Sequence, residues 1–280
     1  MKGRVVTAGT DGQMAAARPE RIAGPAGRPA GRVAAGLLAA TALMALAVAI
    51  LTAVAWPDLV LPDAFSNLGG AVAAVAYATL GMLIVRRAGN LIGWIMLGEG
   101  AGQAFVSLAS AYAVIGIATH PGTLPAAEVV GALAECIFVP VAFGIAFMVF
   151  LFPSGTLPSR RWRPVTAAGF LLAGLALAGL VVTPRLVALP APGGTSLTFQ
   201  NPLSAGSLGP VLPAVPFGTL KGLFLVVALF LAAAFVSLVV RYRAGGPLLR
   251  QQVKWLALMA VGIVICQPIG LLASRSASHG

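Results

Sequence analysis

The chain is poor in the residues that carry most enzyme and metal chemistry. Among 280 residues it has seven acidic side chains, two histidines and two cysteines, and only 9% of its residues are charged. A soluble globular domain has roughly 25% charged residues, so this composition cannot cover a surface that faces water. Hydrophobic residues make up 59% of the chain. The balance therefore favours a protein surrounded by lipid.

The few histidines and cysteines form no catalytic or metal-binding pattern. His120 falls in a predicted loop and His279 is the last residue but one, and neither has a metal-ligand partner at a suitable spacing. Cys136 and Cys266 lie within apolar runs, which favours small packing residues, although a pairing between them is left open. No Ser-His-Asp set can be placed on one face. We expect no enzyme activity, no cofactor and no metal site.

Long apolar runs fill residues 33–274. Each reaches or nearly reaches the ~18–20 residues that a transmembrane helix needs, whereas barrel strands would be about ten residues long with alternating polarity. The sequence therefore predicts an all-α fold, a polytopic transmembrane helical bundle of about seven spans. The predicted spans are Val33–Trp56, Leu68–Val85, Leu91–Ile117, Glu128–Phe152, Val165–Val182, Leu220–Val240 and Trp255–Ser274.

Three other segments are expected to lie outside the membrane. Residues 1–32 are rich in Gly, Ala, Pro and Arg, which predicts a disordered basic tail. The connection Pro184–Gly218 is long and rich in Pro, Gly and Ser, so we expect an exposed loop without regular structure. Residues 275–280 form a short tail after the last predicted span.

The basic residues predict the orientation. The net charge of +11 comes from short clusters between alternate apolar runs, which indicates membrane topology and not nucleic-acid binding. With the amino terminus in the cytoplasm, all lysines and arginines face the cytoplasm except Arg185, Lys221 and Arg275. Seven crossings then place the carboxyl terminus outside the cell. The predicted cytoplasmic anchors beyond the tail are Arg86, Arg87, Arg160, Arg161, Arg163, Arg241, Arg243, Arg250 and Lys254. The expected location is the plasma membrane.

Two acidic residues fall deep inside predicted spans. Glu99 lies in the third span and Glu135 in the fourth, where a charged carboxylate costs about 2.5 kcal/mol or more. Each lies roughly eight residues in from an opposite face, so antiparallel neighbours are expected to hold them within several ångströms in depth. Gln103 and Ser107 follow Glu99 by one and two turns. The group is either a proton-titratable or cation-binding site, or a pair of protonated acids that hydrogen-bond to neighbouring helices.

Small residues recur at a spacing of four in the second and third predicted spans. Gly70, Ala74 and Ala78 form one such series, and Gly98 and Gly102 form another. Small side chains allow two helix backbones to approach closely, so the pattern predicts tight packing. It does not indicate an oligomeric state.

Three segments at predicted cytoplasmic boundaries carry a family resemblance. They are RRAGNLIGW at 86–94, LFPSGTLPSRRWRP at 151–164 and RQQVKWLA at 250–257. Their order and spacing resemble the amino-terminal membrane (sensor) region of actinobacterial multi-pass sensor histidine kinases. Asn201-Pro202-Leu203 also resembles that family, and the resemblance covers about residues 33–270.

The chain departs from the family at identifiable positions. Leu91 replaces the usual Pro, Ser154 the usual Asp, Thr156 the usual Arg and Leu249 the usual Glu. The family continues into dimerisation and ATP-binding domains, but this sequence has no phosphoacceptor histidine segment and no glycine-rich ATP lid. Autophosphorylation is therefore not implied.

These observations lead to one functional expectation and two alternatives. The expectation is a non-catalytic integral membrane protein that detects a membrane-associated signal and relays it to a membrane or cytoplasmic signalling partner. The first alternative is a transporter or channel-like component that uses Glu99 and Glu135. The second is a truncated, non-functional kinase remnant. Besides the lipid bilayer no binding partner is identified, and we expect no nucleic acid.

Overall fold

The structure is a computed structural model, and it describes part of the 280-residue chain. The described residues are 28–54, 61–88, 90–157, 159–191, 195–204 and 220–244, together with positions 246, 247, 250, 251 and 254. The predicted seventh span and both predicted tails, apart from residues 28–32, lie outside these ranges.

The described residues contain six helices that are long and apolar enough to cross a membrane. They confirm the predicted all-α transmembrane bundle, and they are compatible with a multi-pass membrane protein. The helices are α1 (Arg28–Val54), α2 (Leu61–Ala88), α3 (Leu91–Val114), α4 (Ala127–Leu151), α5 (Arg163–Val182) and α6 (Leu220–Ala244). A π-helical turn, Ile115–Thr119, extends α3, and a 3-10 turn, Arg160–Trp162, precedes α5.

The helices α1, α2 and α6 extend furthest beyond the predicted spans. α1 begins at Arg28, so the last residues of the predicted disordered tail are helical. α2 begins at Leu61 and not at Leu68, and α6 continues to Ala244. Hydropathy marks where a segment suits lipid, whereas helical hydrogen bonds continue through polar residues. Pro29 and Pro62 lie in the first turns of α1 and α2, where proline is tolerated because its missing N–H would have no helical partner.

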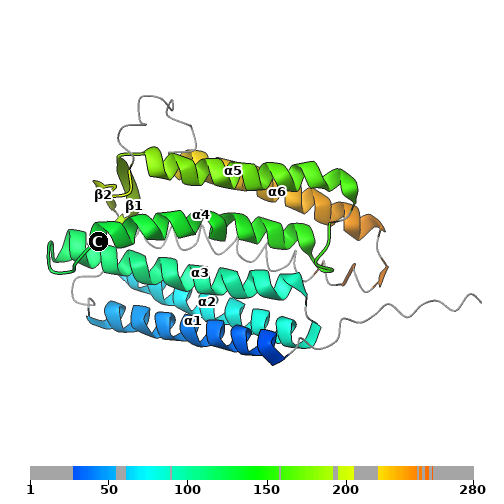
Figure 1. The fold of residues 1–280 in the computed structure, drawn as a ribbon, viewed down its shortest axis with the longest axis horizontal. Coiled ribbons are helices and arrows are strands. Elements are labelled where there is room, and N and C mark those ends of the chain that lie inside the picture. The colour runs from blue at the N-terminus through cyan, green and yellow to red at the C-terminus, as the bar shows by residue number, and fades with distance from the viewer. Residues whose placement is uncertain are drawn as a thin grey trace, which may run out of the picture.

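The helices lie side by side, and successive helices run in opposite directions (Figure 1). α3 contacts α1, α2 and α4, while α4 contacts α3, α5 and α6. α3 and α4 are thus the central pair, which joins a first half (α1–α3) to a second half (α4–α6).

The distribution of side-chain size supports a lipid-facing exterior. Buried positions are dominated by alanine, as at Ala78 and Ala104. Many large apolar side chains instead point outward, with Leu43 and Phe170 each 67% exposed. Such an exterior would be unfavourable in water, and it matches a surface solvated by lipid chains.

The first half packs through its backbones. A Cβ atom placed on Gly81 of α2 would lie 2.7 Å from the carbonyl oxygen of Gly93 on α3. One placed on Gly100 of α3 would lie 2.6 Å from the carbonyl oxygen of Ala74. No side chain larger than hydrogen fits at these positions, so glycine allows α2 and α3 to touch.

The second half packs through aromatic rings. The ring centroid of Phe230 on α6 lies 5.8 Å from that of Phe143, 5.1 Å from that of Phe147 and 5.0 Å from that of Phe150, all on α4. The same ring covers Gly169 of α5. Phe230 therefore joins all three helices of this half.

A two-stranded antiparallel hairpin follows α5. β1 (Arg185–Ala191) pairs with β2 (Thr195–Gln200), with an irregularity between Ala188 and Pro190. This contradicts the predicted absence of regular structure in the first part of Pro184–Gly218. β1 is a continuous apolar run after Arg185, and β2 alternates polar residues with Leu197 and Phe199, as strands commonly do. A two-stranded sheet has only edges, where proline is tolerated.

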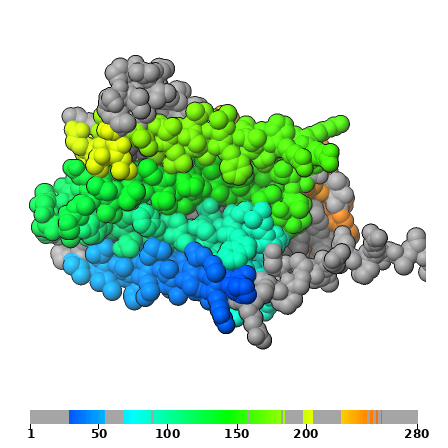
Figure 2. All heavy atoms as spheres, in the orientation of Figure 1, coloured from blue at the N-terminus to red at the C-terminus, as the bar shows by residue number. Residues whose placement is uncertain are grey.

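The hairpin is attached to the helices at one end of the bundle. Phe199 of β2 is 5% exposed and packs on Ala132 of α4 and Leu180 of α5. The adjacent Asn201 donates to the carbonyl oxygens of Leu180 and Thr183, both at 2.8 Å, and so caps the last turn of α5. In Figure 2 this segment, in yellow, lies against α4 and α5.

Candidate functional site

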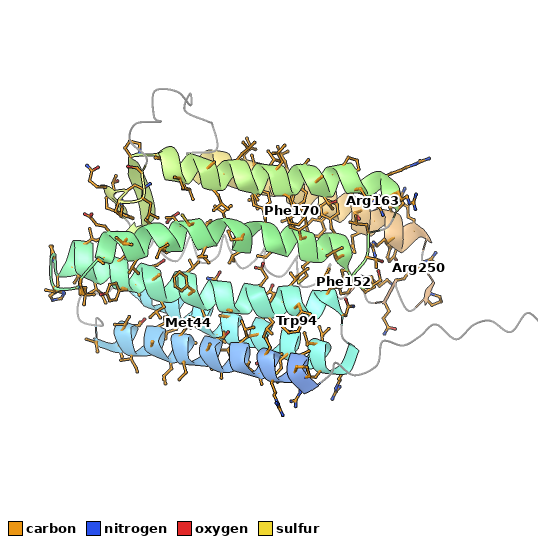
Figure 3. The ribbon with its side chains drawn as sticks, in the orientation of Figure 1. Met44, Trp94, Phe152, Arg163, Phe170 and Arg250 are labelled. Atoms are coloured by element: carbon orange, nitrogen blue, oxygen red, sulfur yellow. The ribbon has the colours of Figure 1, made fainter. Side chains whose placement is uncertain are left out.

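Two regions of the molecule contain the polar side chains that are candidates for function. One region is inside the bundle and contains the predicted carboxyl groups. The other is the end where α2, α4 and α6 terminate and α3 and α5 begin, here called the arginine-rich end. Arg163 and Arg250 are both found there, on the right of Figure 3.

Glu99 lies on the buried face of α3 and reaches α4. Its side chain is 9% exposed. One carboxyl oxygen occupies the place that a Cβ atom would take on Gly144, and the carboxyl carbon lies 2.8 Å from that place. Tyr77 of α2 lies at the same level along the bundle, because Gly100, next to Glu99, packs against Ala74 and Ala78 of α2. Residues of three helices thus surround one acid.

Gln103 and Ser107 face a different helix. The Nε2 of Gln103 donates to the Oγ of Ser107 at 3.4 Å. A Cβ atom on Gly70 of α2 would lie 3.3 Å from that Oγ and 3.8 Å from that Nε2. The two polar groups therefore bond to each other beside α2, and no described contact joins them to Glu99.

The structure separates Glu99 from Glu135, which contradicts the prediction that they lie at similar depth. Along the antiparallel pair, Gly116 of the π-helical turn meets Ala127 and Gly102 meets Val141. In the same register Glu135 is opposite residue 108, nine positions beyond Glu99. At 1.5 Å per residue the two are about 13 Å apart along the bundle. Glu135 is 8% exposed, so both acids are buried at separate levels.

Arg241 organises the arginine-rich end. Its Nη2 donates to the carbonyl oxygen of Phe150 at 3.0 Å and to that of Thr156, and its Nη1 donates to the Oγ of Ser154 at 3.2 Å. The last turn of α6 is thereby hydrogen-bonded to the turn 152–157 that follows α4. A guanidinium group suits this role because it presents several donors in a fixed plane.

Asn90 at the start of α3 is hydrogen-bonded to the same turn. Its Oδ1 accepts from the N–H of Ile92 at 3.1 Å and caps α3, while its Nδ2 donates to the carbonyl oxygen of Pro153 at 3.4 Å. Gly155 has φ +76°, and a Cβ atom there would collide with the side-chain oxygen of Asn90. Glycine is therefore required both for the left-handed turn and for this contact.

Aromatic contacts complete the arginine-rich end. The Trp162 ring lies 5.8 Å from the Phe150 ring, and the Arg250 guanidinium lies 5.9 Å from the centroid of Tyr242. Trp94 packs beside the buried Leu97 at the start of α3. The remaining predicted anchors are exposed: Arg86, Arg87, Arg160, Arg161, Arg163, Arg243, Arg250 and Lys254.

The sequence reasoning missed several of these roles. Arg241 was predicted only as a topological anchor, yet it is partly buried and bonded to the turn after α4. Asn90 carried a usable signal, because asparagine before an apolar helical run is a common N-cap. Nothing in the sequence marks Gly144 as the place where Glu99 lies. Within the described residues no three His, Cys, Asp or Glu side chains are grouped as metal ligands.

Comparison of the chain with protein-family models, curated proteins and solved structures finds no match. The molecule is thus defined by its architecture: an α-helical membrane-type bundle with buried acids between its helices and a hydrogen-bonded turn at its arginine-rich end.

Proposed function

We propose that the chain is a non-catalytic signal-relay protein of the cell membrane, with its arginine-rich end in the cytoplasm. The orientation is supported by the gathering of basic residues at one end, since cytoplasmic loops are enriched in Lys and Arg. The relay role extends the resemblance to the sensor region of histidine kinases.

The observation that carries the proposal is the attachment of one turn to three helices. The turn 152–157 follows α4, is bonded by Arg241 to the end of α6, and is bonded by Asn90 to the start of α3. A small shift of any of these helices within the membrane must change the turn. Ser154 and Thr156 are exposed on it, so such a shift would reach a partner at this surface.

Site-specific photo-crosslinking in native membranes tests the relay proposal. A photoreactive residue at Ser159, exposed and next to the turn, is expected to capture a partner protein, and the same residue at His120, in the loop that precedes α4, is expected not to. Adding Arg241→Ala should reduce the Ser159 product, because the turn loses its bonds to α6. Capture that is unchanged by Arg241→Ala would overturn the proposal.

A transport function is the second candidate, favoured by two acids that are each about nine-tenths buried. Because Glu99 and Glu135 lie about 13 Å apart along the bundle, transport would need two separate stations and not one shared site. Proton flux into liposomes decides between the two functions. Flux that disappears in Glu99→Gln and in Glu135→Gln would replace the relay proposal with transport.

A further inference from the structure

The contact between Glu99 and Gly144 is the feature of the molecule that neither proposed function explains. The acid extends from α3 into a notch on α4 that exists only because residue 144 has no side chain. Among the residues that the structure describes, its carboxyl group makes no hydrogen bond, although the side chain is only 9% exposed. Burying this carboxyl group without a hydrogen bond costs far more free energy when it is ionised than when it is protonated.

We propose that Glu99 is a proton-exchange site whose protonated carboxyl group occupies the Gly144 notch, and that loss of the proton moves the group out of the notch toward Tyr77. The inference requires no partner protein and no net transport, so it does not depend on either proposed function, although it concerns the same acid as the transport candidate.

The chemistry of the notch supports the neutral form. Its wall is the backbone of α4, whose N–H groups in mid-helix bond to carbonyl groups four residues earlier, so it offers no free donor. A protonated carboxyl group has its own donor and carries no charge, whereas a carboxylate has only acceptors and is costly at this depth. The notch can therefore hold the acid but not its anion.

The environment on the other side supports the ionised form. Tyr77 is half-buried on α2 and lies level with Glu99, because the adjacent Gly100 packs against Ala74 and Ala78. Its hydroxyl can donate a hydrogen bond to a carboxylate. On deprotonation the carboxyl O–H bond breaks and a water molecule takes up the proton by forming a new O–H bond, and the reverse transfer restores the acid.

No other charged group of the described helices faces Glu99. On α4 the titratable neighbour is Glu135, about 13 Å away along the axis. On α1 the described basic side chain is Arg32, exposed at the arginine-rich end. α3 itself contains no Lys, Arg or His. Tyr77 is therefore the polar group that responds to the charge.

Infrared difference spectroscopy on the full chain in lipid nanodiscs tests the proposal during a pH titration. We expect one carbonyl stretch of a protonated acid that disappears as the pH rises and is missing in Glu99→Gln but retained in Glu135→Gln. A spectrum without a titrating band that depends on Glu99 would overturn the proposal.

Two variants test the role of the Gly144 notch and the role of the Tyr77 hydroxyl separately. Gly144→Ala fills the notch, and the displaced group is the end of a flexible side chain, so we expect a folded protein with a shifted carbonyl frequency. Gly174→Ala, where a Cβ atom meets nothing within 4 Å, is the matched control and should leave the band in place. Tyr77→Phe should move the titration midpoint but leave the frequency of the protonated form unchanged.

One further variant and one change of conditions allow the proposal to be refuted even if Gly144→Ala does not fold. Glu99→Asp retains the acid but shortens its reach, so a titrating band at a new frequency is expected even if Gly144→Ala does not fold. An unchanged band in both Gly144→Ala and Glu99→Asp would refute the claim that the protonated carboxyl group occupies the Gly144 notch. Loss of the band on addition of sodium at constant pH would overturn the assignment to a proton and indicate a cation site.

Discussion

The two halves of the bundle are held together by opposite means. In α1–α3 the close contacts run from backbone to backbone, as at Gly81 and Gly100, and the buried side chains are mostly alanines. In α4–α6 the contacts run through large side chains, with Phe230 against three rings of α4. The first half therefore depends on glycines that have no side chain, and the second half depends on large aromatic side chains.

The lipid surroundings explain why both kinds of packing can hold helices together. Lipid chains are as apolar as a helix surface, so hydrophobic burial contributes little to helix association, and close packing has to supply the attraction. Backbones that touch and rings that interlock both give dense contact. The comparison predicts that the first half is sensitive to enlarged residues and the second half to truncated ones.

Enlarging Gly81 is expected to have the largest effect. In Gly81→Leu the new side chain would meet the backbone of α3, so α2 and α3 must separate, at a cost of about 3 kcal/mol or more. Unfolding by denaturing detergent in mixed micelles measures the loss. Gly69→Leu on the same helix is the control, because a Cβ atom there has nothing within 4 Å. Equal stability of the two variants would refute the backbone-contact account.

Truncating Phe230 is the converse experiment. Phe230→Ala removes the ring that joins α4, α5 and α6 and leaves a cavity, and we expect a loss of about 3 kcal/mol. Leu229→Ala is a suitable control because Leu229 is 63% exposed. If the neighbouring truncation is equally destabilising in the same detergent assay, the ring contacts are not what holds this half.

Removing Arg241 tests whether polar groups add to the second half. Hydrogen bonds to charged groups contribute about 1.5–3 kcal/mol each, and Arg241→Ala loses those to Phe150, Ser154 and Thr156. We expect faster hydrogen exchange in residues 152–157 with a smaller change in overall stability. Arg243→Ala, at an exposed position of the same turn, should leave exchange unchanged.

The six described spans could be predicted because lipid demands long apolar runs. Helix ends could not, since hydrogen bonding does not stop where apolarity does: α2 begins seven residues before its predicted span. The hairpin was missed because the length of Pro184–Gly218 and its richness in Pro, Gly and Ser favoured a loop, although a two-stranded sheet tolerates Pro190 at its edge. The resemblance to sensor kinases stays a prediction.

The depth error for the two acids has a specific cause. Both were placed by counting inward from span ends, as if the helices had the minimum length of ~20 residues. The predicted spans Leu91–Ile117 and Glu128–Phe152 were already about as long as α3 with its π-helical turn and as α4, so eight residues counted in from each end leave about nine residues between the acids. Register between helices depends on contacts such as Gly102 with Val141, which a single sequence does not reveal.

Asn201 offers the mildest test of the comparison, at the end opposite the arginine-rich one. Asn201→Ala removes two hydrogen bonds to the last carbonyl groups of α5, a loss of about 1 kcal/mol, since each is worth roughly 0.5–1.5 kcal/mol and the freed carbonyl groups can find other partners. We expect faster exchange in residues 195–204 and little change in Phe230-dependent stability. Gln200→Ala is the control, because Gln200 is exposed. If Asn201→Ala instead destabilised the protein as much as Phe230→Ala does, the polar cap and not the aromatic cluster would be what secures α5, and the contrast between the halves would need to be redrawn.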